Sequence, residues 1–460
     1  MRHCFFISAI LLGISFSCPL ESAEPPPNVI IVFADDLGYG DLGCFGHPTI
    51  RTPELDRMAR EGMKLTQFYS AAPVCTPSRA ALMTGRLPAR SGMCSNKRRV
   101  LFPNSKGGIP EGEITLAEAL KARGYATGCI GKWHLGHLPP YLPTSNGFDS
   151  YFGIPYSNDM DRVAGSPKGR AAFLEPLVKY WNVPLMRDQQ IVEQPADQRT
   201  ITRRYTEEAV RFIKQNRKQP FFLYLPHSLP HVPLFRSAEF EGRSARGLYG
   251  DVIEEIDWSV GQILATLRRL RLDDNTIVFF TSDNGPWLIF NEHGGSAGLL
   301  RDGKGSTWEG GMREPTLAWW PGTIPGGSLA TDVCSTMDIY ATVHQLAGIP
   351  MPTDRVTDSH DLLPVLTASG PSTREMLFYY RGYRLMAVRK GPWKMHLMTQ
   401  NAYGQPEPIV HERPLLFHLD HDPSEKHDLG EKNADVIAQL MEDVKRHQSN
   451  LEPAPSELEK

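Results

Sequence analysis

One short run of residues has the types and spacing of a reactive centre. In Cys75-Thr76-Pro77-Ser78-Arg79, the proline suits the first turn of a helix. Cys75 would then lie at a helix start, where free N–H groups and the helix dipole favour an anion. Arg79, four residues further on, shares its helical face. Alone, the run would also fit a half-buried cysteine beside a surface arginine.

Oxygen ligands for a metal ion come from two other places in the chain. Asp35 and Asp36 are adjacent, and Asp283 and Asn284 form a second pair. Three carboxylates and one amide oxygen suit a hard cation, Ca²⁺ or Mg²⁺, rather than Zn²⁺. A single aspartate after a strand is commonly a turn residue. Two pairs, each after a predicted strand, indicate a metal site.

Three basic residues, Arg79, Lys132 and Lys304, are candidates for holding an anionic substrate beside these carboxylates, whereas a lone lysine or arginine is commonly a solvated surface group. Lys132 follows a predicted strand, and Lys304 lies between Gly303 and Gly305, which would let the backbone approach an anion closely. The whole chain has a net charge of −3, so it offers no basic surface for nucleic acid. An anion must therefore be held by a local cluster of positive charge.

Histidines supply candidate proton carriers near neutral pH. His134 follows the same strand as Lys132, and His227 and His231 follow another. The residue types alone leave all three histidines as candidates, and a role in supporting the loop is the alternative for His227. Ser157, taken alone, fits a turn serine.

Four apolar runs position these groups, and each ends where a candidate begins. The runs are Val29–Phe33, Ala126–Ile130, Phe221–Leu225 and Thr276–Phe280. Uninterrupted apolar runs are typical of strands buried on both faces of a parallel sheet. Amphipathic helices are predicted over Ile201–Asn216, Tyr249–Leu270 and Ser335–Ala347. The sequence thus predicts an α/β fold, a large, mostly parallel sheet sandwiched by helices, with its site at the carboxyl ends of the strands.

The pattern changes after about residue 355. Short strand candidates joined by tight turns precede one helix, Ala434–Gln448, which indicates a small antiparallel sheet with a helix. The strand candidates are Leu377–Tyr380, Tyr383–Val388, Trp393–Leu397 and Leu415–Leu419. We expect a large domain over residues 24–355 and a small one over 356–460. Asp159–Arg199 is expected to be an irregular insertion, and Leu451–Lys460 a frayed end.

The N-terminus predicts export. Arg2 and His3 precede the apolar run Cys4–Cys18, and small residues follow near Ala23. This arrangement is typical of a secretory signal over residues 1–23 and is short for a transmembrane span. We expect a secreted or periplasmic protein; a lipid anchor at Cys18 is the alternative. Five cysteines then remain, an odd number that flags a reactive or modified thiol in a secreted chain.

Taken in order, these runs resemble the type I sulfatases, closest to the arylsulfatase A and N-acetylgalactosamine-6-sulfatase branch. The resemblance extends from Asn28 to about Leu429. It is carried by Cys-x-Pro-x-Arg continued to Arg86, and by Ala34–Asp41, Gly131–Gly136, Gly153–Ser157, Ser282–Gly285 and Gly303–Gly305. It implies an alkaline-phosphatase-like fold and hydrolysis of sulfate monoesters to an alcohol and inorganic sulfate. Aryl sulfates would serve in an assay, and sulfated carbohydrates would be the natural substrates.

The resemblance also implies a cofactor set and residue roles. Cys75 would be oxidised to formylglycine by a formylglycine-generating or other sulfatase-maturating enzyme before folding ends. One Ca²⁺ would be bound by Asp35, Asp36, Asp283, Asn284 and an oxygen of modified Cys75. The catalytic residues would be Cys75, Arg79, Lys132, His134, His231 and Lys304. Substrate would contact Lys132, Ser157, His231 and Lys304.

The implied chemistry uses an aldehyde hydrate, which places two hydroxyls on one carbon. One hydroxyl attacks sulfur while His231 and Lys304 assist the leaving oxygen, and the other expels sulfate with His134 as base. Two alternatives stay open at this point. One is a phosphomonoester or phosphonate hydrolase of the same superfamily. The other is an inactive sulfoglycan-binding protein, which would result if Cys75 stays unmodified.

Overall fold

The structure is a computed structural model that describes Met1 and residues 25–460. The predicted signal segment and the possible anchor at Cys18 lie outside the described residues. Within the described part, no helix has the length and apolar character needed to cross a membrane.

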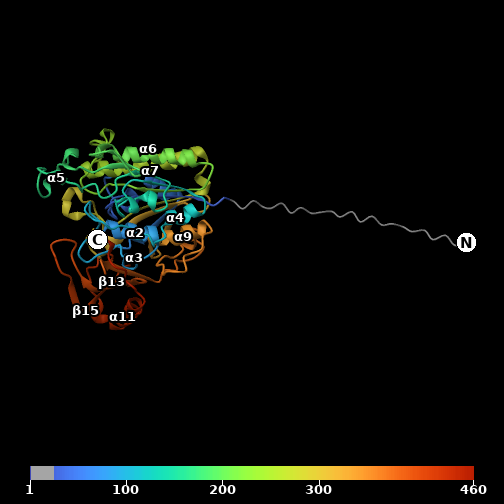
Figure 1. Cartoon of the computed structure of the whole chain (residues 1–460). Helices are drawn as coiled ribbons and strands as arrows, with labels where there is room; N and C mark the ends of the chain where they lie inside the picture. The colour runs from blue at the N-terminus through green and yellow to red at the C-terminus, as the bar shows by residue number, and fades with distance from the viewer. Residues whose placement is uncertain (2–24) are drawn as a thin grey trace.

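A mixed sheet of eleven strands forms the centre of the larger part (Figure 1). Its strands are β1 (Asn28–Ala34), β2 (Met63–Tyr69), β3 (Ala126–Ile130), β4 (Ser150–Gly153), β5 (Leu185–Arg187), β6 (Gln190–Glu193), β7 (Phe221–Pro226), β8 (Thr276–Ser282), β9 (Arg313–Trp319), β10 (Ser328–Ala330) and β11 (Cys334–Ser335). The order is β10-β2-β9-β8-β1-β7-β3-β4-β5-β6, with β11 also paired to β2. The consecutive strands β8, β1, β7, β3 and β4 are parallel, so their carboxyl ends share one edge.

Helices cover both faces of this sheet. The α-helices are α1 (Pro53–Glu61), α2 (Cys75–Thr84), α3 (Pro88–Ser91), α4 (Leu116–Ala122), α5 (Ala171–Leu174), α6 (Ile201–Asn216), α7 (Gly247–Leu270), α8 (Glu309–Met312), α9 (Asp338–Leu346), α10 (Leu363–Leu366) and α11 (Ala434–Ser449). In β1, Ile30 and Val32 pack in the core with α6 and α7, whereas Val29 and Ile31 pack in the core with α2, α4 and α9. Figure 1 shows these two helical layers above and below the sheet. The predicted α/β sandwich is therefore confirmed.

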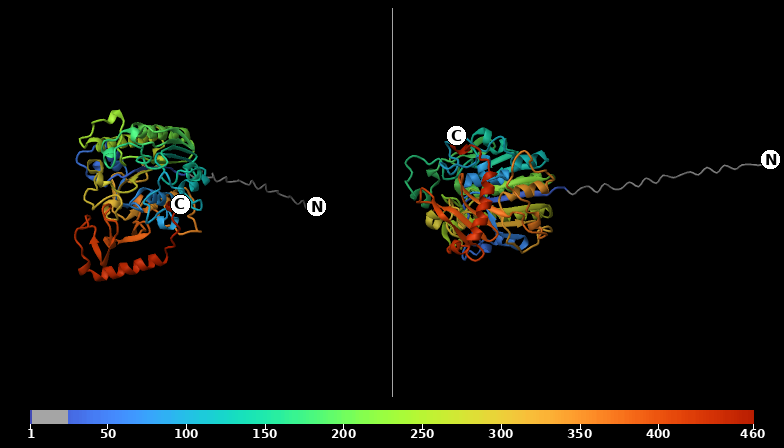
Figure 2. Two further views of the ribbon diagram at one scale, coloured as in Figure 1. Left: turned by 60° about the vertical axis from the view of Figure 1, so that its left-hand side comes forward. Right: turned by 90° about the horizontal axis from the view of Figure 1, so that it is seen from below.

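The C-terminal part is a four-stranded antiparallel sheet with one long helix. Its strands are β12 (Met376–Arg381), β13 (Arg384–Lys390), β14 (Trp393–Thr399) and β15 (Ile409–His418), paired in that order. Leu440 and Val444 of α11 pack against this sheet and against Ala81 and Leu87 of the larger part. In Figure 2 the sheet and α11 form a layer of their own beside the main body. The predicted small sheet and helix are confirmed, and the 355/356 domain boundary stays a prediction.

The insertion differs in part from its prediction. Asp159–Arg199 contains β5 and β6, which extend the main sheet as an antiparallel pair. Both strands are short and β6 is mostly exposed, so they carry little of the apolar pattern on which a sequence-based prediction depends.

The C-terminal end also differs, because Leu451–Lys460 is not frayed. The Ala454 and Glu457 N–H groups donate to the carbonyls of Ala89 and Gly92 at 2.9 Å each. Leu458 is fully buried in the core that holds α2 and α4. Contacts with distant residues fix this segment, and local sequence gives no sign of them.

The five cysteines of the described chain are all free thiols, with no disulfide among them. They are Cys44, Cys75, Cys94, Cys129 and Cys334. The question of pairing left open by the sequence is thus answered for the described residues.

Candidate active site

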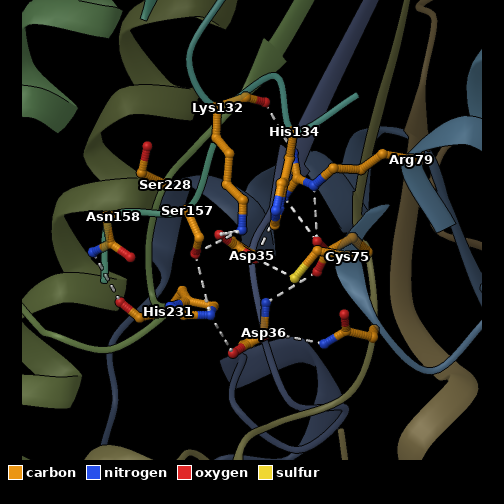
Figure 3. A network of polar contacts seen from close by, with 12 residues as sticks. Asp35, Asp36, Cys75, Arg79, Lys132, His134, Ser157, Asn158, Ser228 and His231 are labelled. Carbon is orange, nitrogen blue, oxygen red and sulfur yellow. Dashed lines mark hydrogen bonds and ion pairs between the residues drawn. The ribbon is translucent and has the colours of Figure 1, made fainter. Parts of the chain in front are cut away.

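Four parallel strands deliver the candidate residues to one edge of the sheet. Asp35 and Asp36 follow β1, Asp283 and Asn284 follow β8, Lys132 and His134 follow β3, and His231 lies beyond β7. The start of α2 approaches the same edge, and Figure 3 shows the side chains meeting there. This is the position at which open α/β sheets bind ligands.

Cys75 is the first residue of α2 and lies in the middle of the group. Val74 is extended and the helix begins directly after it, so the thiol lies at the helix start. Cys75 is only 2% exposed. Its Sγ lies 3.5 Å from Asp35 Oδ1 and 3.5 Å from Lys304 Nζ. The thiol is thus placed between a carboxylate and an ammonium group.

Arg79 lies one turn along α2 and is fully buried. Its Nε and Nη2 contact Asp283 Oδ2 at 3.0 and 2.8 Å, and Nη2 lies 3.4 Å from Asp35 Oδ1. Its Nη1 donates to the carbonyl oxygen of Lys132 at 3.1 Å. One guanidinium therefore links α2 to the ends of three strands.

Lys132 connects the aspartates to the opposite side of the site. Its Nζ donates to Asp35 Oδ2 at 2.6 Å and to Ser157 Oγ at 3.1 Å. Ser157 Oγ lies 3.4 Å from His231 Nε2, and Figure 3 marks this contact with a dashed line. His231 Nδ1 lies 2.5 Å from the carbonyl oxygen of Val232, so Nδ1 carries the proton and Nε2 faces the site.

A second lysine approaches from the other side. Lys304 Nζ lies 2.7 Å from Asp36 Oδ1 and 2.8 Å from Asp36 Oδ2. Asn284 Nδ2 donates to the same carboxylate at 2.7 Å. The Oδ1 atom of Asn284 is buried and has no hydrogen-bond partner among the described residues. An oxygen ligand is therefore available beside two aspartates.

His134 has a defined tautomer. Its Nε2 lies 2.8 Å from the carbonyl oxygen of Leu101, which can only accept, so Nε2 carries the proton. Its Nδ1 is buried with no partner among the described residues and is free to accept a proton. Both Asp36 and His134 have positive φ angles, of 65° and 62°. This conformation is uncommon for residues other than glycine and clusters at functional sites.

The charges of the site oppose the cost of burial. Burial alone would raise the pKa of Asp35, but Lys132, His231, Arg79 and Lys304 hold it well below its usual range. Burial raises the pKa of Asp36 to about 7 and also raises that of the Cys75 thiol. Burial and neighbouring lysines keep the pKa values of His134 and His231 well below normal. Three carboxylates and three cations are thus packed together, with both histidines favouring the neutral form.

Two family models together match most of the chain. The model described as sulfatase matches residues 27–349, and the model described as the C-terminal region of aryl-sulfatase matches residues 372–460. The chain belongs to the sulfatase family. It is accordingly a sulfuric ester hydrolase.

Curated relatives support the same assignment along the whole sulfatase chain. Human N-acetylgalactosamine-6-sulfatase is 42% identical, with 95% of this chain and 88% of the relative covered. Bovine (Bos taurus) arylsulfatase A is 41% identical, with 92% and 87% covered. Rat (Rattus norvegicus) steryl-sulfatase is 37% identical, with 98% and 94% covered.

Solved structures of similar chains share the fold. The PsFucS1 sulfatase from Pseudoalteromonas sp. superposes with a TM-score of 0.82 at 29% identity, covering 93% of this chain and 92% of that one. Ps i-CgsB in complex with k-i-k-neocarrahexaose gives 0.78 at 30% identity, with 94% of each chain covered. A phosphonate monoester hydrolase of Agrobacterium radiobacter gives 0.65 at 18% identity, with 92% and 95% covered, which shows the fold alone.

The sulfatase structure brings nearly all the sequence-based candidates together. One connected set of contacts joins the two aspartate-containing pairs with Cys75, Arg79, Lys132, Ser157, His231 and Lys304. The His134 ring lies beside this set in Figure 3 and bonds the carbonyl oxygen of Leu101 instead. His227 does not join this set. Both of its ring nitrogens are buried without a partner among the described residues, and burial lowers its pKa to about 4.

Sequence reasoning missed three residues of this sulfatase site. Trp287 has its ring centroid 5.1 Å from that of His231 and 4.4 Å from Lys304 Nζ. Tyr403 stacks on Trp287 at 6.0 Å, and we call these two rings the aromatic wall. Asp159 has one carboxylate oxygen buried without a partner among the described residues. Asp159 could have been noticed because it follows Ser157 closely, but Tyr403 comes from the β14–β15 loop and no motif marks it.

Proposed function

We propose that this sulfatase releases sulfate from sulfated carbohydrates with a formylglycine made from Cys75 and one bound Ca²⁺. The observation that carries the proposal is the position of Cys75. Its Sγ lies 3.5 Å from the Asp35 carboxylate and 3.5 Å from the Lys304 ammonium. A group at this point can meet both a cation held by the aspartates and an anion held by the lysines.

The four proposed ligands fit a hard cation. Asp35, Asp36, Asp283 and Asn284 offer oxygen donors, and the Oδ1 of Asn284 has no other partner among the described residues. Asp35, Asp36, Cys75 and His231 also have donor atoms within 4.8 Å of one another. We assign His231 to substrate because its Nε2 lies 3.4 Å from Ser157, on the side of Lys132. When bound, Ca²⁺ would stabilise negative charge on sulfate oxygens and on the attacking oxygen.

Conversion of Cys75 supplies the nucleophile that a thiol does not. A formylglycine side chain offers a hydrated aldehyde in place of the thiol at the same helix start. Arg79 and Lys132 both contact the Asp35 carboxylate that lies beside Cys75 Sγ, and Arg79 also donates to the Lys132 carbonyl oxygen. The arrangement fixes one side chain among opposite charges, which favours attack from a single direction.

Proton transfers are assigned from the tautomers of His134 and His231. His134 presents a neutral Nδ1 that has no partner in the part of the chain that the structure describes and can take a proton from the hydroxyl at position 75. His231 and Lys304 lie on the opposite side, where His231 Nε2 and Lys304 Nζ can assist the departing oxygen. Lys132 and Lys304 would hold the sulfate oxygens, with Ser157 beside Lys132.

The substrate class is inferred from the relatives. Relatives at about 42% identity are named for N-acetylgalactosamine 6-sulfate, and one similar structure contains a neocarrahexaose. Sulfated carbohydrates, including galactosamine-type glycosaminoglycans, are therefore the proposed natural substrates. The proposed location is outside the cytoplasm, because residues 1–23 have the composition of a secretory signal.

The decisive experiment follows the state of Cys75 and the release of sulfate together. The full chain is produced with a sulfatase-maturating enzyme, and the peptide holding Cys75 is weighed; formylglycine is about 18 Da lighter than cysteine. Converted protein should release sulfate from an aryl sulfate. Cys75→Ala should fold and release none, while Cys334→Ala, another buried cysteine, should stay active. Sulfate release by Cys75→Ala, or by protein with no conversion, would contradict the proposal.

Cation removal tests the metal assignment with a readout besides activity. Ca²⁺ at one hundred times its dissociation constant should stabilise the folded state by about 2.7 kcal/mol, seen as a higher melting temperature. Chelation should remove this gain, and Asp36→Asn should reduce it. An unchanged melting temperature on adding Ca²⁺ to chelated protein would refute a calcium site here.

The formylglycine-bearing protein also tests the two alternative functions, a phosphomonoester or phosphonate hydrolase and an inactive sulfoglycan-binding protein. Rates on the sulfate and phosphate esters of one phenol separate a sulfatase from a phosphomonoesterase, and we expect the sulfate ester to be preferred. A sulfoglycan-binding protein without activity would bind sulfated saccharides while Cys75 remains a thiol.

A further inference from the structure

A cavity of about 200 Å³ lies next to the active site, between residues 94–99 and the C-terminal sheet. Its lining includes Val74 and Pro77, which flank Cys75, and Gly305, which follows Lys304. The other side of the cavity is formed by Arg381, Arg384 and the segment around Gln400 and Pro406. The cavity therefore shares its inner wall with the site at Cys75 and takes its outer wall from the other domain.

The charged residues in this lining are mostly positive. They are Lys97, Arg98, Arg99, Arg381 and Arg384, against one acid, Glu407. Two of the five are neutralised, because Lys97 pairs with Glu459 at 3.0 Å and Arg384 with Glu407 at 3.3 Å. We call the cavity with the remaining three arginines the basic cleft.

The three arginines of the basic cleft have no carboxylate partner within the described chain. Arg99 Nη2 donates to the carbonyl oxygen of Ala402 at 2.8 Å, and Arg381 Nη1 to that of Asn401 at 3.1 Å. Arg98 Nη1 bonds the Ser105 hydroxyl at 3.3 Å. Burial and the nearby charge of Arg99 lower the pKa of Arg381 to about 10. Like charges gathered without a counterion favour the binding of an anion.

A continuous row of side chains leads from the catalytic residues to this cleft. His231 contacts the aromatic wall at Trp287, Tyr403 stacks on Trp287, and Arg99 lies over the Tyr403 ring at 4.7 Å. On the other side, Arg99 Nη1 lies 2.9 Å from the position that a Cβ at Gly305 would occupy. A glycine there leaves Arg99 room beside the residue that follows Lys304.

We propose that the basic cleft binds a second anionic group of the substrate, carried by the sugar next to the one whose sulfate ester reacts. The inference rests on the proposed function. Arginine binds sulfate and carboxylate through paired N–H donors, so either group suits the cleft. The aromatic wall would lie along the intervening sugar ring. The natural substrate is then a polyanionic saccharide rather than a singly sulfated one.

The test compares three disaccharides on the formylglycine-bearing full chain. Each has one reacting sulfate ester, and the neighbouring sugar is neutral, sulfated or a uronate. Arg99→Gln and Arg381→Gln should lower kcat/KM at least about tenfold for one or both dianionic substrates, because a charged hydrogen bond is lost. For the neutral disaccharide the change should stay below about threefold. The dianionic substrate whose kcat/KM falls more in these variants identifies the second group as sulfate or carboxylate.

Arg384→Gln is the matched control, since this arginine lines the same cavity but is paired with Glu407. This variant should change kcat/KM on each of the three disaccharides by less than about threefold, because the charge of Arg384 is already neutralised. The inference would be overturned if both test variants lost kcat/KM equally on all three substrates, or lost none on any of them. Arg99 is exposed, so its variant carries the test even if Arg381→Gln folds poorly. A wild-type protein that releases no sulfate from any ester would instead refute the proposed function.

Discussion

At the scale of single residues, Arg79 has the most demanding position. Its guanidinium is fully buried and contacts Asp283, Asp35 and the Lys132 carbonyl oxygen at the same time. A lysine keeps the charge but has one terminal nitrogen instead of a planar fork. It cannot reach all three partners in the same geometry.

Arg79→Lys should therefore reduce kcat/KM on an aryl sulfate by about 10² or more, because misplacement of catalytic groups by about 1 Å can cost that much. Steady-state kinetics on protein with matched formylglycine content measures the effect. Arg86→Lys is the control: it belongs to the same run, but its guanidinium pairs with Glu113 away from the site, and activity should hold. Similar losses in both variants would show that Arg79 has no special role.

At the scale of elements, a buried ion cluster fixes the C-terminal sheet to the larger part. Lys394 on β14 lies 3.0 Å from Glu309 Oε1 and 3.0 Å from Glu425 Oε1, and donates to the carbonyl oxygen of Thr307 at 2.9 Å. All three charged side chains are fully buried. Thr307 and Glu309 follow Lys304 closely, so the same cluster fixes the segment that carries this proposed catalytic lysine.

Lys394→Met should lower the free energy of unfolding by about 3–5 kcal/mol, because it leaves buried carboxylates without a counter-charge. Urea unfolding measures the loss. Lys445→Met removes an exposed pair with Glu442 on α11 and should cost no more than about 0.5 kcal/mol. Equal stability of the two variants would mean that the cluster contributes nothing.

The docking of α11 should depend on pH through His447. Its ring stacks on Phe378 at 3.5 Å, and Nε2 lies 2.8 Å from the Tyr380 hydroxyl. Burial lowers the pKa of His447 from 6.5 to about 4, so the folded state favours the neutral ring. The contribution of His447 to stability is then present above the unfolded pKa of 6.5 and lost as pH falls toward 4.

Melting temperatures of the wild type and His447→Gln should therefore differ most near neutral pH and converge as pH falls toward 4. Subtracting the two curves removes the effect of the other histidines. A difference that stays constant over this range would contradict the assignment.

The elements also show what the sequence determines locally. β3 and α6 have the predicted bounds, because an uninterrupted apolar run and a clear helical period are local signals. The residues after β1, β3, β7 and β8 could be placed at one site because parallel strands share their carboxyl edge. Tyr403 and Arg381 could not be placed near the site from the sequence, because they reach it only through packing of the C-terminal sheet. Leu458 was missed for the same reason, because its neighbours lie far away in the chain.

At the scale of the whole molecule, residues 454–458 close the core of the larger part. Leu458 is fully buried beside α2 and α4, and the preceding residues bond to the backbone at Ala89 and Gly92. Leu458→Ala should thus lower the free energy of unfolding by about 2–5 kcal/mol, the usual range for a leucine in a core. Leu299, which is 76% exposed, is the matched control, and its change to alanine should cost little. Calorimetry or urea unfolding checks both, and a cost below about 1 kcal/mol at Leu458 would show a loosely held end.

The position of Leu458 has a consequence for shortened forms of the protein. Synthesis begins at the N-terminus, so the strands that carry the proposed catalytic residues are made before the segment that closes the core beside α2 and α4. A form that ends before Ala454 would lose a core side chain and two backbone hydrogen bonds, to α3 and to the residue after it. Such a form should therefore be less stable, although it keeps every residue of the proposed site.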